Sequence, residues 1–193
     1  MSILGNFTWD EPVKKHVVAR TSKLKATNCG HIYDVLDTVN DIEQGSLIKL
    51  GDYVDGELQL RKAETPTATD KIVFICSVPT IYDESTATAQ NEYNFYNVRG
   101  KACRGYEIVE NDIFGVSDNA FTTKVGEAPA VGNIVVVDDN RLYKELDKGQ
   151  LDATLKTNGF VGRIVGFETY SFETIVLISV IQNTTIVPVA GEL

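Results

Sequence analysis

The sequence VGNIVVV, residues 131–137, shows how this chain builds its structure. A turn pair, Gly132-Asn133, stands directly before a run of β-branched residues, which is how a chain reverses and enters a sheet. The same order recurs in LGDYV at 50–54 and in ENDIFGV at 110–116, and a further apolar run, IVLISVI, occupies 175–181. These stretches predict a protein made mainly of β-strands.

Strand and turn signals continue between these stretches. Gln44-Gly45 precedes an apolar run, and Asp55-Gly56 separates two apolar segments, the pattern of a β-hairpin. Strands recur every roughly 8–12 residues, which favours a barrel or a sandwich over a parallel sheet with intervening helices. Only residues 141–156 show a competing helical pattern. We therefore predict an all-β fold: an antiparallel β-barrel or sandwich with little helix.

Length and composition fit one domain with terminal extensions. The chain has 193 residues, of which 43% are hydrophobic, enough for one domain with a good core. Phe7 and Trp9 fall outside any strand pattern, and exposed large aromatics often mark a partner surface, although both rings could equally pack on the domain. We predict an extended N-terminal arm at 1–20, a β-barrel or sandwich domain at 21–185 and a short C-terminal tail at 186–193.

The charge of the chain argues against a general nucleic-acid binder. The net charge is −9, whereas affinity for phosphate comes mainly from clustered Lys and Arg. The first residues lack a basic region followed by a long apolar stretch, so we expect no signal peptide. No apolar run approaches the roughly 20 residues that a membrane span needs. We expect a soluble protein with no nucleic-acid or membrane partner.

The cysteines and histidines predict no metal or redox site. The three cysteines, Cys29, Cys76 and Cys103, form no CxxC pair, so we expect no disulfide framework. We expect the protein to fold in a reducing cytosol. Cys76 ends the apolar run IVFIC and is expected in the core. Cys29 and His31 lie close together, but a zinc site needs three or four ligands and no second such pair exists. We predict no cofactor, no bound metal and no catalytic residue.

Paired carboxylates leave one enzymatic alternative open. Asp138-Asp139, the clearest pair, is followed by Asn140 and reads as a hydrated turn. Glycoside hydrolysis would need two carboxyl groups held on opposite sides of a cleft. A hydrolase built on Asp138 and Asp139 is the alternative from the enzyme class.

One basic cluster stands out against the acidic background. Arg99, Lys101 and Arg104 fall within six residues, with Tyr96 and Tyr106 beside them. Interleaved cations and aromatics are typical of an OB-like groove for single-stranded nucleic acid, which is the alternative from the binding class. One small patch is less than such a groove needs, so we favour contact with an acidic protein surface. The candidate partner-binding residues are Phe7, Trp9, Arg99, Lys101 and Arg104.

Three ordered stretches carry a resemblance to a known group of proteins. They are DIEQGSLI followed by LGDY between 41 and 53, FYNVRGKACRGY at 95–106, and NDIFGVS at 111–117. Together they resemble the capsid decoration proteins of tailed bacteriophages, also called head-stabilising or cement proteins, and the similarity covers most of 25–183. Chains of this group tend to have IENG where this chain has IEQG at 42–45, a change that leaves the turn intact.

The resemblance implies a non-enzymatic virion structural protein. Such a protein is made in the host cytoplasm and sits on the outside of an icosahedral capsid, with the major capsid protein and neighbouring copies as partners and a homo-oligomer on the shell as one arrangement. A ligand that binds only the assembled lattice stabilises that lattice by mass action, and many weakly bound copies act together. An acidic β module that displays surface suits this role.

Overall fold

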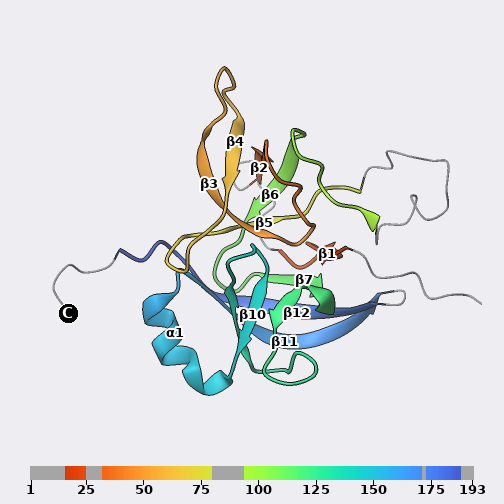
Figure 1. Cartoon of the computed structure of the whole chain (residues 1–193). Coiled ribbons are helices and arrows are strands. Elements are labelled where there is room, and N and C mark those ends of the chain that lie inside the picture. The colour runs from red at the N-terminus through yellow and green to blue at the C-terminus, as the bar shows by residue number, and fades with distance from the viewer. Residues whose placement is uncertain (1–15, 25–31, 80–93, 171–172, 188–193) are drawn as a thin grey trace, which may run out of the picture.

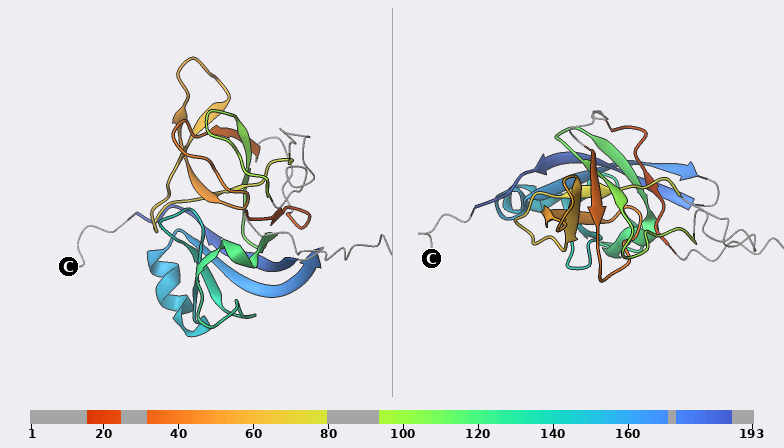
Figure 2. Two further views of the ribbon diagram at one scale, coloured as in Figure 1. Left: turned by 45° about the vertical axis from the view of Figure 1, so that its right-hand side comes forward. Right: turned by 90° about the horizontal axis from the view of Figure 1, so that it is seen from above.

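The computed structural model describes residues 16–24, 32–79, 94–170 and 173–187. In these ranges the chain forms a closed five-stranded barrel and a seven-stranded sheet, and the barrel lies on top of the sheet (Figures 1 and 2). The predicted all-β fold is confirmed.

The barrel closes in the strand order β2-β4-β3-β5-β6. A ring with an odd number of strands cannot alternate direction all the way round, so at least one neighbouring pair must be parallel. That pair is β2 with β4, where Asp34 stands opposite Leu60. The predicted antiparallel pairing therefore has one exception in the barrel. The strands are β2 (Ile32–Leu36), β3 (Leu47–Tyr53), β4 (Leu60–Glu64), β5 (Val73–Ile75) and β6 (Cys103–Glu107).

The sheet has the order β1-β7-β12-β11-β9-β10-β8. Its neighbours are antiparallel except β8 and β10. Its longest part is the hairpin of β11 and β12, which extends to the right in Figure 1. The strands are β1 (Ala19–Arg20), β7 (Ile113–Ser117), β8 (Phe121–Thr123), β9 (Ile134–Val137), β10 (Tyr143–Leu146), β11 (Phe160–Tyr170) and β12 (Glu173–Asn183).

Residues 141–156, for which the sequence showed a helical pattern, form a strand followed by a short helix. The first part is β10, which pairs along its whole length with β9, so pairing overrides the helical spacing of the leucines there. A 3₁₀ turn at Lys148–Gln150 then leads into α1 (Leu151–Thr157). A second 3₁₀ turn, Asp118–Ala120, joins β7 to β8. Across the described ranges, no helix has the length and apolar character to cross a membrane.

Most of the predicted turns are confirmed by backbone geometry. Gly45, Gly56, Asn111 and Gly132 have φ values of 75°, 83°, 66° and 93°, the left-handed region that favours glycine and asparagine. Gly51 is different, because it lies inside β3 where the register with β4 shifts between Leu50 and Tyr53. The predicted turn at Gly51-Asp52 is therefore wrong: these residues form a β-bulge.

Alternating residues of the same barrel strands face two different cores. In β3, Leu47 packs in the core shared with the sheet, while Ile48 packs inside the barrel. In β5, Phe74 packs in the shared core and Val73 packs inside the barrel. This division follows from the two-residue period of a strand, and it makes one wall of the barrel a wall of the shared core.

An aromatic cluster fills the shared core. The ring of Phe114 lies 4.6 Å from Phe74, 6.1 Å from Tyr143 and 6.4 Å from Phe160, measured between ring centroids. These rings come from β7, β5, β10 and β11. Tilted rings at such distances add to the stability that burial alone provides, so the cluster joins barrel and sheet.

Polar contacts reinforce the same joint. The β9–β10 turn reaches the barrel through Arg141, whose carbonyl accepts the Leu47 N–H at 2.7 Å and whose guanidinium lies 2.8 Å from the Asp37 carboxylate. The Tyr143 hydroxyl donates to the carbonyl of Gly45 at 2.5 Å. Burial raises the pKa of Tyr143 well above the ordinary value of a tyrosine, so the phenol remains a donor.

The predicted N-terminal arm is wrong for its last residues. Val17 and Val18 are buried, and β1 pairs antiparallel with β7. Ala19 and Arg20 therefore belong to the sheet, and the side chains of Val17 and Val18 before them pack in its cores. Phe7 and Trp9 lie outside the described residues. At the other end, the N–H of Ile186, in the predicted tail, donates to the carbonyl of Thr69 at 2.8 Å.

Candidate functional site

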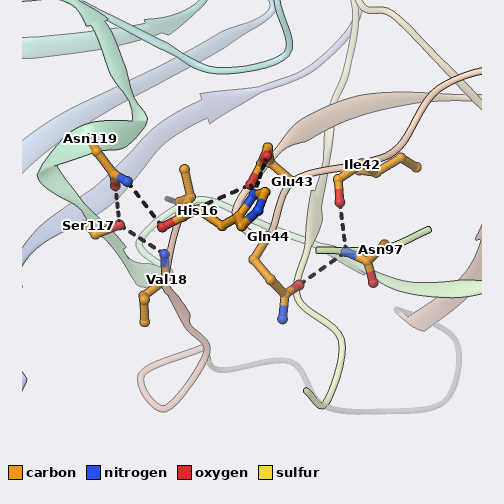
Figure 3. A network of polar contacts seen from close by, with 9 residues as sticks. His16, Val18, Ile42, Glu43, Gln44, Asn97, Ser117 and Asn119 are labelled. Carbon is orange, nitrogen blue, oxygen red and sulfur yellow. Dashed lines mark hydrogen bonds and ion pairs between the residues drawn. The ribbon is translucent and has the colours of Figure 1, made fainter. Parts of the chain in front are cut away.

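A network of polar contacts holds His16 and Val18, just before β1, against the barrel and the sheet (Figure 3). Nδ1 of His16 lies 2.8 Å from Oε1 of Glu43, and its ring stacks on Tyr96 at 4.8 Å. The Asn119 side chain donates to the His16 carbonyl at 3.1 Å, and the Val18 N–H donates to the Ser117 hydroxyl at 2.9 Å. The chain is thus held on both sides where β1 begins.

The network continues through Gln44, which the sequence showed only as a turn residue. Gln44 is buried, and its side chain donates to the Ser77 carbonyl at 2.6 Å and accepts the Ser77 N–H at 2.9 Å. Asn97 donates to the carbonyl of Ile42 at 3.1 Å and lies 3.4 Å from the Gln44 side-chain oxygen (Figure 3). Gln44 therefore joins three separate segments of the barrel.

The structure places the predicted cations among acidic residues. Arg99 and Lys101 are exposed in the turn before β6, and Arg104 is exposed on β6 itself. The Arg99 N–H donates to the Asp41 carboxylate at 2.8 Å, and Arg104 stands directly opposite Asp34 of β2. The surface is therefore mixed in charge, because the acids that interleave the cations come from a distant part of the chain.

The tyrosines beside the cations have other contacts. The Tyr96 ring stacks on His16, and Tyr106 packs against the shared core. A nucleic-acid groove needs aromatic faces on which bases can stack. Tyr96 and Tyr106 are thus both only partly exposed, which argues against the OB-like alternative.

The carboxylates of the enzymatic alternative hold a turn. Asp138 accepts the N–H groups of Asn140 and Leu142 at 2.8 and 2.9 Å and the Thr122 hydroxyl at 2.6 Å. Asp139 is exposed beside it. The hydrogen bonds of Asp138 are those of a turn that closes the β9–β10 hairpin.

A different pair of carboxylates, which the sequence did not suggest, lines a cavity of about 210 Å³. Asp70 lies 3.2 Å from Nζ of Lys49, and Glu107 forms an ion pair with Lys71 and accepts the Tyr33 hydroxyl at 3.1 Å. Burial by itself would raise the pKa of Asp70, but hydrogen bonds from Thr67 and Lys49 outweigh it and lower that pKa. The cavity is thus lined by neutralised ion pairs.

The two described cysteines are unreactive by environment. Burial raises the pKa of Cys76 to about 11 and that of Cys103 to about 12, so neither forms a thiolate near neutral pH. Cys103 is buried and Cys76 only partly so, so the residue expected in the core is the less buried of the two. Within the described ranges no group of three potential metal ligands is present. Cys29 and His31 lie outside these ranges.

A projecting hairpin carries the most exposed apolar side chain of the described structure. Leu58, between β3 and β4, is 91% exposed, and Tyr53 is 53% exposed. The Arg61 guanidinium lies 4.7 Å above the Tyr53 ring. The hairpin stands away from the barrel in Figure 1, and its exposed acidic residues are Asp52, Asp55 and Glu57. Asp55-Gly56 predicted the hairpin, but no local signal showed that it projects.

A second cavity, of about 300 Å³, lies between residues 17–22 and residues 76–79. Phe95 and Tyr106 complete its walls.

Comparison with known protein families, with curated proteins and with solved structures finds no match for this chain.

Proposed function

We propose that this protein is a structural component of a tailed-phage virion that binds the outside of the icosahedral capsid and stabilises it. The observation that carries the proposal is the β3–β4 hairpin, which presents Leu58 and Tyr53 to solvent at a point that projects from the barrel. The three sequence stretches that resemble decoration proteins support it independently.

The hairpin has the chemistry of an attachment element. Covering a fully exposed leucine gains about 2 kcal/mol of hydrophobic free energy. Asp52, Asp55 and Glu57 are exposed on the same hairpin, and the Arg61 guanidinium covers the Tyr53 ring, so the complementary surface is an apolar hollow with basic groups that pair with the three acids. One such contact is weak, but copies arrayed on a shell act together. Because the proposed ligand is the assembled lattice, binding stabilises the shell by mass action.

The joint between barrel and sheet supports a role in bridging. A protein that bridges neighbouring subunits must transmit force without coming apart. Here the aromatic cluster and the ion pair between Asp37 and Arg141 hold the two units as one body. In the same proposal, Arg99, Lys101 and Arg104 contact acidic residues of the capsid protein or of a neighbouring copy.

The test uses phage heads assembled without this protein. We expect the purified chain to co-sediment with such heads to saturation and to raise the temperature at which they release DNA. The Leu58→Ser variant should bind about tenfold or more weakly, because an exposed leucine contributes about 2 kcal/mol when it is covered. Val187→Ser is the matched control, since Val187 is also highly exposed (78%) but follows β12 and lies outside the β3–β4 hairpin.

Two results would contradict the proposal. One is a chain that fails to sediment with heads, or that is found only with free tails. The other is binding that Leu58→Ser leaves unchanged, which would remove the hairpin as the attachment element. A shift of single-stranded DNA in a gel at physiological salt would favour the nucleic-acid alternative instead.

A further inference from the structure

The far half of β11 is an open edge of the sheet. β9 pairs with β11 only at Gly162 and Arg163, and the Gly132 N–H donates to the Ile164 carbonyl. From residue 166 to 170, β11 pairs with β12 on one side, and none of the described strands pairs with it on the other. This open edge lies on the extended hairpin at the right of Figure 1.

Strand geometry identifies which backbone groups point out of this edge. Val180 exchanges hydrogen bonds with the segment before β7, so even-numbered residues of β12 direct their backbone groups towards β7 and odd-numbered residues towards β11. Leu177 and Ile175 therefore bond Gly166 and Glu168. The N–H and C=O groups of Phe167 and Thr169 are left pointing outwards.

The side chains along this open edge are mostly apolar, whereas edges that avoid pairing with other chains usually carry charges. Val165 and Phe167 are 42% and 44% exposed, and Val131 beside them is 58% exposed. Natural proteins usually blunt such an edge with Lys, Pro or a bulge, because it is a template for pairing with another chain. The bulge at Val165 is present, but the residues beyond it carry only one charge, Glu168.

We infer that this edge pairs with the same edge of a second copy of the chain, antiparallel and about a twofold axis at Phe167. A strand paired with itself about such an axis makes every contact twice. The charge of Glu168 is already compensated by an ion pair with Lys23, so two edges can approach without two bare carboxylates. In this register Phe167 stands opposite its own copy, and Glu168 stands opposite Gly166 of the partner.

Neighbouring registers are less favourable. Backbone bonding requires outward-pointing residues to face each other, which limits the axis to Phe167, Glu168 or Thr169. An axis at Glu168 places that carboxylate opposite itself, and like charges directly opposite are destabilising. An axis at Thr169 leaves Phe167 without an apolar counterpart in β11. The axis at Phe167 joins two aromatic side chains and is the one we propose.

Sedimentation velocity of the purified full chain, from about 1 to about 300 μM, tests the pairing independently of any capsid. We expect a reversible shift from monomer to dimer. Phe167→Lys should raise the dissociation constant about tenfold or more by removing an apolar cross-strand pair and adding two charges. Thr169→Pro should do the same, because it deletes an outward N–H while leaving the β12 ladder intact. Val187→Lys is the matched control and should dimerise normally.

Cross-linking tests the register. Across a hydrogen-bonded antiparallel pair the Cα atoms are about 5.5 Å apart, within disulfide range. Phe167→Cys in a Cys29→Ser background should therefore form a disulfide-linked dimer on mild oxidation. Glu168→Cys should not, because its two copies are offset by two residues along the strands, a separation of about 8 Å.

Two outcomes would overturn the inference. The full chain could stay monomeric over the whole range, or it could dimerise with no effect of Phe167→Lys and Thr169→Pro. In the first case, dimerisation through Phe167 of a chain lacking residues 2–12 would make the N-terminal segment the occupant of the edge.

Discussion

Asp37 and Arg141, 104 residues apart in the sequence, form a partly buried ion pair of 2.8 Å that joins the barrel to the β9–β10 turn of the sheet. Asp37 also accepts the N–H groups of Val39 and Asn40, so its carboxylate is fully engaged. Arg141 adopts a φ of 66°, which is unfavourable for a side chain of its size. The ion pair thus starts from a residue whose backbone lies in the left-handed region, inside a turn closed by Asp138.

Breaking this pair should destabilise the protein without changing its fold. We expect Asp37→Asn to lower the free energy of unfolding by about 2 kcal/mol, because the partly buried guanidinium loses its counter-ion. Urea unfolding at pH 7 measures the effect. Asp139→Asn, which changes an exposed aspartate in the turn that carries Arg141, is the control and should cost under about 0.5 kcal/mol. Equal effects of the two substitutions would show that the ion pair does not stabilise the joint.

The same pair should make stability depend on acid pH. Burial by itself would raise the pKa of Asp37, but the N–H groups of Asn40 and Val39 and the Arg141 guanidinium outweigh it, so the native pKa lies below the ordinary value. The stabilisation is therefore complete above the unfolded pKa of about 3.9 and is lost as the pH falls through the native pKa. The difference in unfolding free energy between the wild type and Asp37→Asn should shrink from pH 5 to pH 2. A difference that stays constant over that range would contradict the assignment.

Gly159 should be irreplaceable where the loop before β5 meets the start of β11. A Cβ there would lie 2.4 Å from the carbonyl oxygens of Asp70 and Thr184, and both are backbone atoms. Gly159→Ala should therefore cost about 3 kcal/mol, or more if the loop separates. Gly166→Ala is the matched control, since a Cβ at Gly166 meets nothing within 4 Å. Thermal unfolding followed by circular dichroism compares the two, and a larger loss for Gly166→Ala would refute this packing.

The thiols of Cys76 and Cys103 should become reactive when the protein unfolds, and a change of pH near neutrality should not make them reactive. With pKa values raised to about 11 for Cys76 and about 12 for Cys103, both thiols should react with DTNB at pH 8 only after unfolding. Cys103→Ser should lower stability by about 1–2 kcal/mol, more than Cys76→Ser, because the hydroxyl is buried more fully there. A Cys29→Ser background removes the third thiol. Rapid labelling of the native protein would contradict the burial of these residues.

Local signals predicted the parts of the fold that local physics determines. Asn111 and Gly132 need a left-handed backbone, and an asparagine or a glycine before a β-branched run shows this in the sequence. The parallel pairing of β2 with β4 could not be predicted in this way, because it follows from closing a ring of five strands. The bulge at Gly51 was missed for a similar reason, since a glycine inside a strand and a glycine in a turn look alike until the partner strand is known.

The candidate site was predicted only in part. The sequence located Arg99, Lys101 and Arg104, but it could not show that Asp34 and Asp41 fold back among them. It predicted the β3–β4 hairpin but not its projection, because projection depends on where the barrel ends. The role of Gln44 depends on Ser77 and Asn97, which are distant in sequence. In each case the missing information was a tertiary contact.

The alternation of Leu47 with Ile48 and of Phe74 with Val73 between two cores has a consequence for how this protein changes over time. A gene segment that encodes only the barrel would produce strands whose outward apolar side chains have no sheet to cover them. A segment that encodes only the sheet would likewise lack the barrel that covers its apolar face. Recombination between these units would therefore expose an apolar wall on each product. Barrel and sheet are therefore expected to be inherited together, and a substitution at Leu47 or Phe74, which face the shared core, constrains what the sheet can accept.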